Sequence, residues 1–114
     1  MIKVFLTRNP QGKIISFSVQ GHAGFAPHGQ DIVCSAVSAI AQTAVYGMDR
    51  VVGVKPQVQV REGFLECKVP EYELSPEEMG KIELILETML VGLQEIQRNY
   101  SNCILIKDFS SINK

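Results

Sequence analysis

The chain contains no tryptophan, no CxxC pair and no excess of charge of either sign. Its three cysteines, Cys34, Cys67 and Cys103, are an odd number and lie far apart in the sequence. That pattern favours free thiols in a reducing compartment over a disulfide framework. Neither GxGxxG nor GxxxxGKS/T occurs, so nucleotide binding has no support.

The formal net charge of −1 provides no overall electrostatic attraction for nucleic acid or lipid, so we expect no direct nucleic-acid partner. The first 13 residues hold a five-residue, mostly apolar window before Arg8, which is too short for a signal peptide. No segment approaches the roughly 18 consecutive apolar residues of a membrane span. We therefore expect a cytoplasmic protein without a membrane partner.

The chain has the size and composition of one soluble globular domain covering residues 1–114. Apolar residues make up 46% of it and charged residues 20%, which is ordinary for this class. A chain of 114 residues is long enough to bury a single hydrophobic core.

The pattern of apolar residues and turn signals predicts five strands and two helices. The Asn9–Gly12 segment reads as a hairpin turn, and Ser75 with Glu78 reads as the capping box of a helix. In chain order we predict strands 2–8 and 13–21, a loop 22–30, a helix 31–52, strands 57–61 and 64–69, a helix from 75–78 to about 99, and a strand 102–108 followed by a frayed polar tail. This β-β-α-β-β-α-β order predicts an α+β fold, with two helices on one face of a mainly antiparallel sheet.

Cys34 is the strongest candidate for chemistry because it lies near the predicted start of an apolar helix. The unpaired N–H groups and positive dipole end of such a helix can acidify a thiol, and the same N–H groups could serve as an oxyanion hole. Helical spacing places Asp31, Cys34 and Ser38 on one side of the helix. A polar line on an apolar helix fits the edge of an active site. The plain alternative is that Cys34 is a small buried hydrophobic residue.

The chain has two histidines, His22 and His28. His22 follows a predicted strand end and Gly21, so a rigid element would position it as a general base. His28 lies within the loop, where a solvent-exposed histidine is expected. His22, His28 and Cys34 could also hold a metal with Asp31 or water, but their spacing matches no familiar zinc pattern. We expect no metal and no cofactor.

Cys67 and Cys103 fall within predicted strands, where packing is their expected role. Neither has a histidine or a helix terminus nearby in the sequence. A redox-sensing role for Cys34 is a weak alternative, since no resolving cysteine lies near it in the sequence.

Gly21-His22-Ala23, followed by GQDIVC at 29–34 and SAVS at 35–38, resembles the ribosomal-processing cysteine proteases of Firmicutes and related bacteria. The resemblance covers nearly the whole chain. It implies a cytoplasmic homodimeric endopeptidase with a Cys/His dyad and no cofactor. Its implied substrate is a ribosomal large-subunit protein, from which it removes a short N-terminal extension by cutting after an aromatic residue.

The resemblance also assigns roles to residues of this chain. It makes Cys34 the nucleophile and His22 the general base, and it gives Asp31 and Ser38 supporting or substrate-contacting roles. The glycines that match the family's flexible segment are Gly21, Gly24 and Gly29. Ser35 departs from the alanine usual in the family, a change between small side chains. The alternative function is a non-enzymatic ribosome-assembly or RNA-contacting module, for which Cys34→Ser would be harmless.

Overall fold

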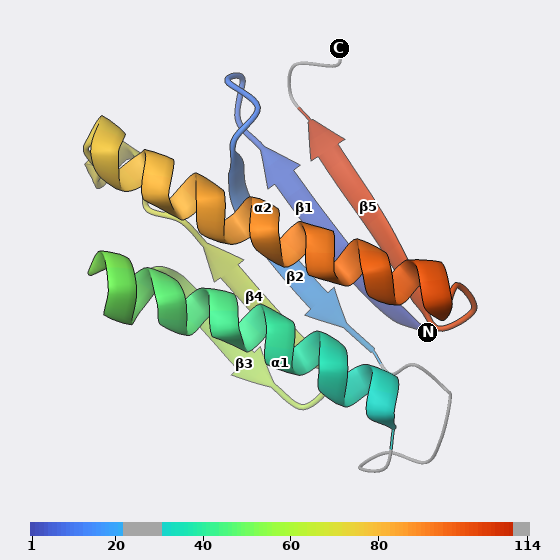
Figure 1. Ribbon diagram of the computed structural model, residues 1–114. Coiled ribbons are helices and arrows are strands. Elements are labelled where there is room, and N and C mark those ends of the chain that lie inside the picture. The colour runs from blue at the N-terminus through green and yellow to red at the C-terminus, as the bar shows by residue number, and fades with distance from the viewer. Residues whose placement is uncertain (22–30, 111–114) are drawn as a thin grey trace.

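In the computed structural model, which describes residues 1–21 and 31–110, one face of a five-stranded sheet carries both helices (Figure 1). The α+β prediction is confirmed, and so is the order of strands and helices. The elements are β1 (Ile2–Arg8), β2 (Ile14–Gln20), α1 (Ile32–Gly47), η1 (Met48–Val52), β3 (Gln57–Arg61), β4 (Phe64–Lys68), η2 (Glu71–Glu73), α2 (Pro76–Asn99) and β5 (Ile104–Ser110).

The strand order across the sheet is β3-β4-β2-β1-β5. The β1–β2, β2–β4 and β3–β4 pairs are antiparallel, whereas β5 runs parallel to β1. The mainly antiparallel prediction is therefore right, and β5 is the exception. The strands β3 and β5 form the two edges of the sheet.

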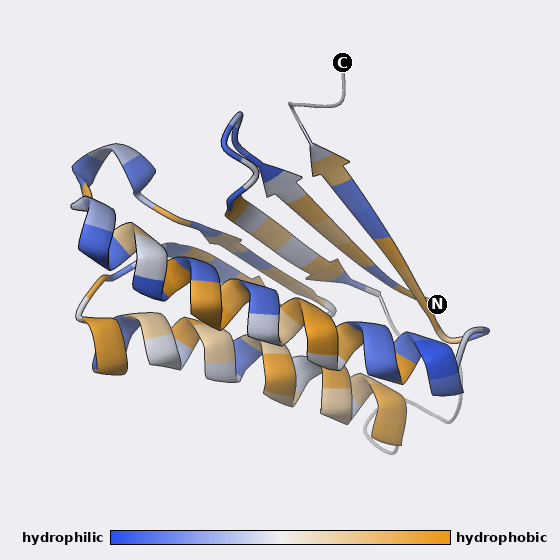
Figure 2. Cartoon of the chain, turned by 45° about the horizontal axis from the view of Figure 1, so that its top comes forward, coloured by the Kyte–Doolittle hydropathy of each residue, from blue (hydrophilic) through white to orange (hydrophobic). Residues whose placement is uncertain are grey.

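The core lies between the sheet and the two helices. In β1, Ile2, Val4 and Leu6 are fully buried, and the residues between them point to the other face. Leu6 pairs with Phe17 of β2, so both side chains lie on the helix side of the sheet. Figure 2 shows apolar residues on both helices as well as on the strands. The helical residues buried in this core are Val33, Val37, Ala41, Ala44, Met48, Met79, Ile82, Leu86, Met89, Leu90 and Leu93.

The capping box predicted at the start of α2 is confirmed. The Glu78 N–H donates to Ser75 Oγ at 3.1 Å, and the Ser75 N–H donates to the Glu78 carboxylate at 2.9 Å. Pro76 occupies the first turn, where its missing N–H costs nothing. The helix ends at Asn99, as predicted.

Two predicted boundaries are wrong. The first long helix does not stay α-helical to residue 52, because residues Met48–Val52 form a π-helical turn that stops at Gly53, whose φ is +84°. The last strand begins at Ile104 and includes Phe109 and Ser110, which were assigned to a frayed tail. Backbone pairing with β1 holds these two residues in the sheet. Cys103 consequently lies in the turn before β5, where it is buried.

The stretch Ile32–Val52 is long and apolar enough to cross a membrane by length and mean hydropathy alone. Its inward residues, including Val33, Val37 and Ala41, are buried in the core. The same stretch carries the polar residues Ser38 and Gln42 on its surface. We interpret it as a core helix.

We predict that Ser75→Ala lowers the free energy of unfolding by about 1 kcal/mol, because the Glu78 N–H loses its acceptor. Chemical denaturation monitored by circular dichroism measures the change. Ser101→Ala, at an exposed turn residue before β5, is the matched control and should change stability by less than about 0.5 kcal/mol. Equal effects of the two substitutions would contradict a stabilising role for the cap.

Candidate active site

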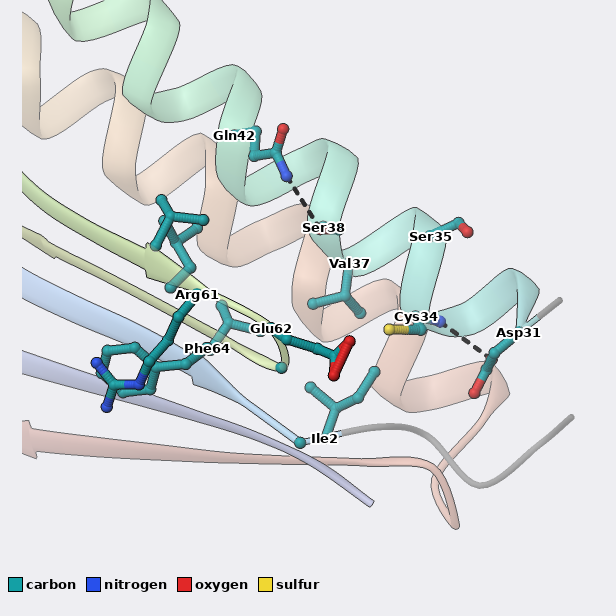
Figure 3. A pocket seen from close by; sticks show the side chains of 15 residues that line it. Ile2, Asp31, Cys34, Ser35, Val37, Ser38, Gln42, Arg61, Glu62 and Phe64 are labelled. Atoms are coloured by element: carbon teal, nitrogen blue, oxygen red, sulfur yellow. Dashed lines mark hydrogen bonds between the residues drawn. The ribbon is translucent and has the colours of Figure 1, made fainter. Parts of the chain in front are cut away.

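A cavity of about 360 Å³ lies between the N-terminal half of α1 and the β3–β4 hairpin (Figure 3). Its helix side is polar, and its floor is formed by apolar side chains of the core. The lining residues are Ile2, Val19, Gly21, Asp31, Cys34, Ser35, Val37, Ser38, Gln42, Val60, Arg61, Glu62, Gly63, Phe64 and Leu65.

Asp31 is the N-cap of α1 and is only 3% exposed. Its Oδ1 accepts hydrogen bonds from the backbone N–H groups of Val33 at 3.0 Å and Cys34 at 3.1 Å. Its Oδ2 is buried and has no hydrogen-bond partner among the described residues. The carboxylate therefore fixes the first turn of α1, and one of its oxygens is left to accept another donor beside the cavity.

Cys34 is the third residue of α1, and its sulfur points into the cavity (Figure 3). Burial raises the pKa of the Cys34 thiol, and the negative charge of Asp31 raises it further. The described residues therefore oppose ionisation of Cys34, and acidification of the thiol by the helix start stays a prediction. Asp31 accepts hydrogen bonds from the N–H groups of Val33 and Cys34 and adds a negative charge beside the sulfur.

The other two cysteines differ from Cys34 in their surroundings. Cys67 is fully buried on the helix side of β4, and burial raises the pKa of its thiol to about 12. Cys103 is also buried, whereas Cys34 is half-buried at the cavity. The packing role predicted for Cys67 and Cys103 fits these positions.

The predicted polar line of Asp31, Cys34 and Ser38 does face one cavity. One turn beyond Ser38, Gln42 donates from Nε2 to Ser38 Oγ at 3.1 Å. Gln42 was not among the predicted site residues, although helical spacing alone places it next in the line. The structure extends the polar edge of the cavity along three turns of α1.

The tip of the β3–β4 hairpin forms the opposite wall, which sequence reasoning missed. Figure 3 shows the Glu62 side chain pointing from this tip toward Cys34, while Arg61 turns away and covers the Phe64 ring. The guanidinium carbon of Arg61 lies 3.9 Å from the ring centroid. The sequence signalled a tight turn at Glu62-Gly63 but gave no sign that this turn meets α1.

Gly21 links the end of β2 to this hairpin. Its N–H donates to the Gly63 carbonyl at 2.9 Å, and its φ of +85° is a conformation that side chains rarely adopt. A Cβ at this position would lie 2.8 Å from the Met1 carbonyl oxygen. Glycine is therefore required where the chain reaches the cavity.

The remaining predicted site residues, His22, Gly24 and Gly29, lie outside the described residues, as does His28. The Cys/His geometry therefore stays a prediction. The described residues contain no group of three or more His, Cys, Asp or Glu side chains that could hold a metal ion. The alternative metal set, which includes both histidines, falls largely outside this range.

Comparison with known proteins gives consistent matches along the chain. A family model described as cysteine protease Prp matches residues 1–105. The ribosomal processing cysteine protease Prp of Bacillus subtilis (strain 168) is 38% identical over 104 residues, which cover 90% of this chain and 92% of that protein. The protein of the same name from Staphylococcus aureus (strain Mu50) is 31% identical over 91% of this chain and 95% of its own length.

Solved structures agree with the sequence matches. The crystal structure of the essential ribosomal processing protease Prp from S. aureus with a covalently linked product peptide superposes with a TM-score of 0.84 at 29% identity. The match covers 95% of this chain and 99% of that one. The same S. aureus protease in complex with a substrate peptide gives a TM-score of 0.79 at 28% identity.

We predict that Asp31→Asn lowers the pKa of the Cys34 thiol, because it removes a negative charge that opposes ionisation. Asparagine retains a side-chain oxygen that can cap the helix. The change is best measured in a His22→Ala background, so that Asp31 does not act through the imidazole. The pH dependence of iodoacetamide alkylation, with the modified residue identified by mass spectrometry, reports the thiol pKa.

Asp49→Asn in the same background is the control, because it removes the same charge at the far end of the helix. It should leave the Cys34 profile in place. A Cys34 pKa that is unchanged or higher in the Asp31 variant would show that the carboxylate does not oppose ionisation.

Proposed function

The chain belongs to the cysteine protease Prp family and is a cysteine peptidase, and we propose that it removes the N-terminal extension of a ribosomal large-subunit protein. The observation that carries this proposal is the Cys34 sulfur directed into a cavity with a polar helix edge and an apolar floor. The S. aureus relative bound to product and substrate peptides supports a peptide as the occupant of this cavity.

The proposed reaction is acyl transfer by Cys34 with His22 as general base. His22 takes the thiol proton, the sulfur attacks the scissile carbonyl, and the imidazolium returns the proton to the leaving amine. The second half repeats the cycle with water, which releases the acid and restores the thiol. Burial and the charge of Asp31 both raise the pKa of the Cys34 thiol. A base is therefore needed to take its proton.

Asp31 has a place in this mechanism through its second carboxylate oxygen. Oδ2 is buried at the cavity and has no donor among the described residues. A protonated His22 would satisfy it and would also supply the cation that Cys34 needs. Burying a carboxylate oxygen without a hydrogen bond is unfavourable in free energy, which supports the presence of such a donor.

The oxyanion donors are more restricted than the sequence indicates. The N–H groups of Val33 and Cys34 bind Asp31 Oδ1, and that of Ser35 binds the Asp31 carbonyl at 3.1 Å. These three groups are not free to hold a developing oxyanion. We propose the Ile32 N–H, the other donor of the first turn, in their place.

The cavity fits the proposed cut after an aromatic residue. Ile2, Val37 and Leu65 supply an apolar floor, which suits an aromatic side chain better than a charged one. The outer edge of β3 pairs with none of the described strands, and all five of its residues are exposed. We propose that an extended peptide pairs with this edge and places its aromatic side chain in the cavity.

We predict that the purified protein cleaves the extended ribosomal protein and that Cys34→Ala abolishes cleavage. His22→Ala should reduce kcat by at least about 100-fold, because general-base catalysis contributes this much. Mass spectrometry of the products gives the rate and the cut site. Replacing the aromatic residue before the cut with alanine should slow cleavage mainly through weaker binding in the apolar cavity.

Cys103→Ala is the matched control, since it removes a thiol that does not line the cavity. It should cleave at close to the wild-type rate. Activity retained in Cys34→Ala would contradict the mechanism. Normal ribosome assembly in cells carrying Cys34→Ser would favour a non-enzymatic assembly role.

We further propose that two copies of the chain associate through a groove between α1 and α2. This groove is mostly apolar, and its rim includes Val51 and Leu84, which are 82% and 71% exposed. Its small residues Ala39, Gly47 and Gly92 allow close approach of a second helix pair. The full lining is Ala39, Ile40, Thr43, Ala44, Gly47, Val51, Leu84, Ile85, Thr88, Met89 and Gly92.

We predict a dimer of twice the 12.6 kDa chain mass that Leu84→Glu converts to a monomer, because a charge cannot be buried unpaired in an apolar interface. Light scattering after size-exclusion chromatography measures the mass. Tyr72→Glu, at a 96% exposed residue away from this groove, is the control and should remain dimeric. A monomeric wild-type protein, or a dimeric Leu84→Glu, would rule out this interface.

A further inference from the structure

The sheet face opposite the helices is not covered by any other described element (Figure 1). We call it the open face and define it by the strand residues that alternate with the buried ones. Its members are Lys3, Phe5, Thr7, Ser16, Gln20, Gln57, Gln59, Arg61, Phe64, Glu66, Lys68, Leu105, Lys107 and Phe109.

The open face has a different charge balance from the whole chain. It carries Lys3, Arg61, Lys68 and Lys107 but a single carboxylate, Glu66. The complete chain has 11 lysines and arginines against 12 aspartates and glutamates. The sheet therefore gathers positive charge on a face that the overall composition conceals.

Aromatic rings lie among these cations at both sides of the open face. The Phe5 and Phe109 rings are stacked, with centroids 6.1 Å apart and planes at 18°. Phe109 is 53% exposed, and Lys107 lies directly opposite Phe5 in the strand register. At the other side, Arg61 covers the Phe64 ring.

We propose that the open face binds single-stranded nucleic acid. An exposed ring on a sheet, flanked by cations, is a combination that suits such strands, since bases stack on rings and phosphates pair with cations. On this face the exposed ring is Phe109. Lys3 and Lys107 would contact phosphates, and Phe109 would stack on a base. The polar residues between the aromatic positions, including Thr7 and Ser16, offer hydroxyl groups to sugar and base edges.

The residues that carry the proposed contacts, Lys3, Lys107 and Phe109, do not line the Cys34 cavity. Arg61 and Phe64 at the hairpin end belong to the open face by register and also line that cavity. The near-zero net charge led to the prediction that no nucleic acid binds directly. The net charge does not show that strand register gathers cations and rings, which are spread from residue 3 to residue 109, on one surface.

Fluorescence anisotropy with fluorescein-labelled U12 RNA and T12 DNA tests the proposal on the full-length chain across a salt series. Lys3→Gln/Lys107→Gln should weaken binding and make the slope of log affinity against log salt shallower by about 1.4, at about 0.7 per lost phosphate contact. Phe109→Ala should weaken binding roughly ten-fold with little change in slope, because it removes a stacking partner. Lys81→Gln/Arg98→Gln on α2 removes the same charge and should bind like the wild type.

A wild-type protein that binds neither oligonucleotide would overturn the proposal. So would equal weakening by the α2 control pair, or equal affinity for a polyglutamate peptide of the same charge. A preference for RNA over DNA, or none, supports the proposal and identifies the kind of strand. The open-face variants should cleave the isolated ribosomal substrate at the wild-type rate, so this result is independent of the proposed peptidase function.

Discussion

The hydrogen bonds from the first turn of α1 to the Asp31 carboxylate are the interaction on which the rest of the site depends. They hold Cys34 at a fixed position on the helix, and the helix in turn faces the β3–β4 hairpin. Burial raises the pKa of the Cys34 thiol, and the charge of this carboxylate raises it further. Asp31 thus positions Cys34 through the helix and at the same time opposes ionisation of its thiol.

Because both helices pack on one face of the sheet, the molecule has a helix-covered side and an open face. Both helices bury the same face, so the core and the Cys34 cavity lie together on that side. The opposite face keeps its lysines and the Phe109 ring exposed. The contacts proposed for nucleic acid at Lys3, Lys107 and Phe109 use none of the residues that line the Cys34 cavity.

Most of the fold follows from sequence signals that act locally. The Asn9–Gly12 turn, the Ser75 capping box and the apolar periodicity of α2 each depend on residues close together in the chain. The parallel pairing of β5 with β1 was not predictable in this way, since it joins residues about 100 positions apart. Nor was the meeting of Glu62 with the Cys34 cavity. The effect of burial and of the Asp31 charge on the Cys34 pKa was also not predictable from the sequence, since it depends on how the start of α1 packs.

The pairing of the last strand with the first has a consequence for how the molecule is made. β1 lacks one of its two neighbours until residues 104–110 are available, and the Ile2 N–H donates to the Cys103 carbonyl at 2.8 Å. Ile2 is also part of the cavity floor. Contacts of such long sequence separation form late and slowly. A nascent chain on the ribosome would therefore carry Cys34 before it has a finished cavity, which is complete only once residues 104–110 have paired with β1.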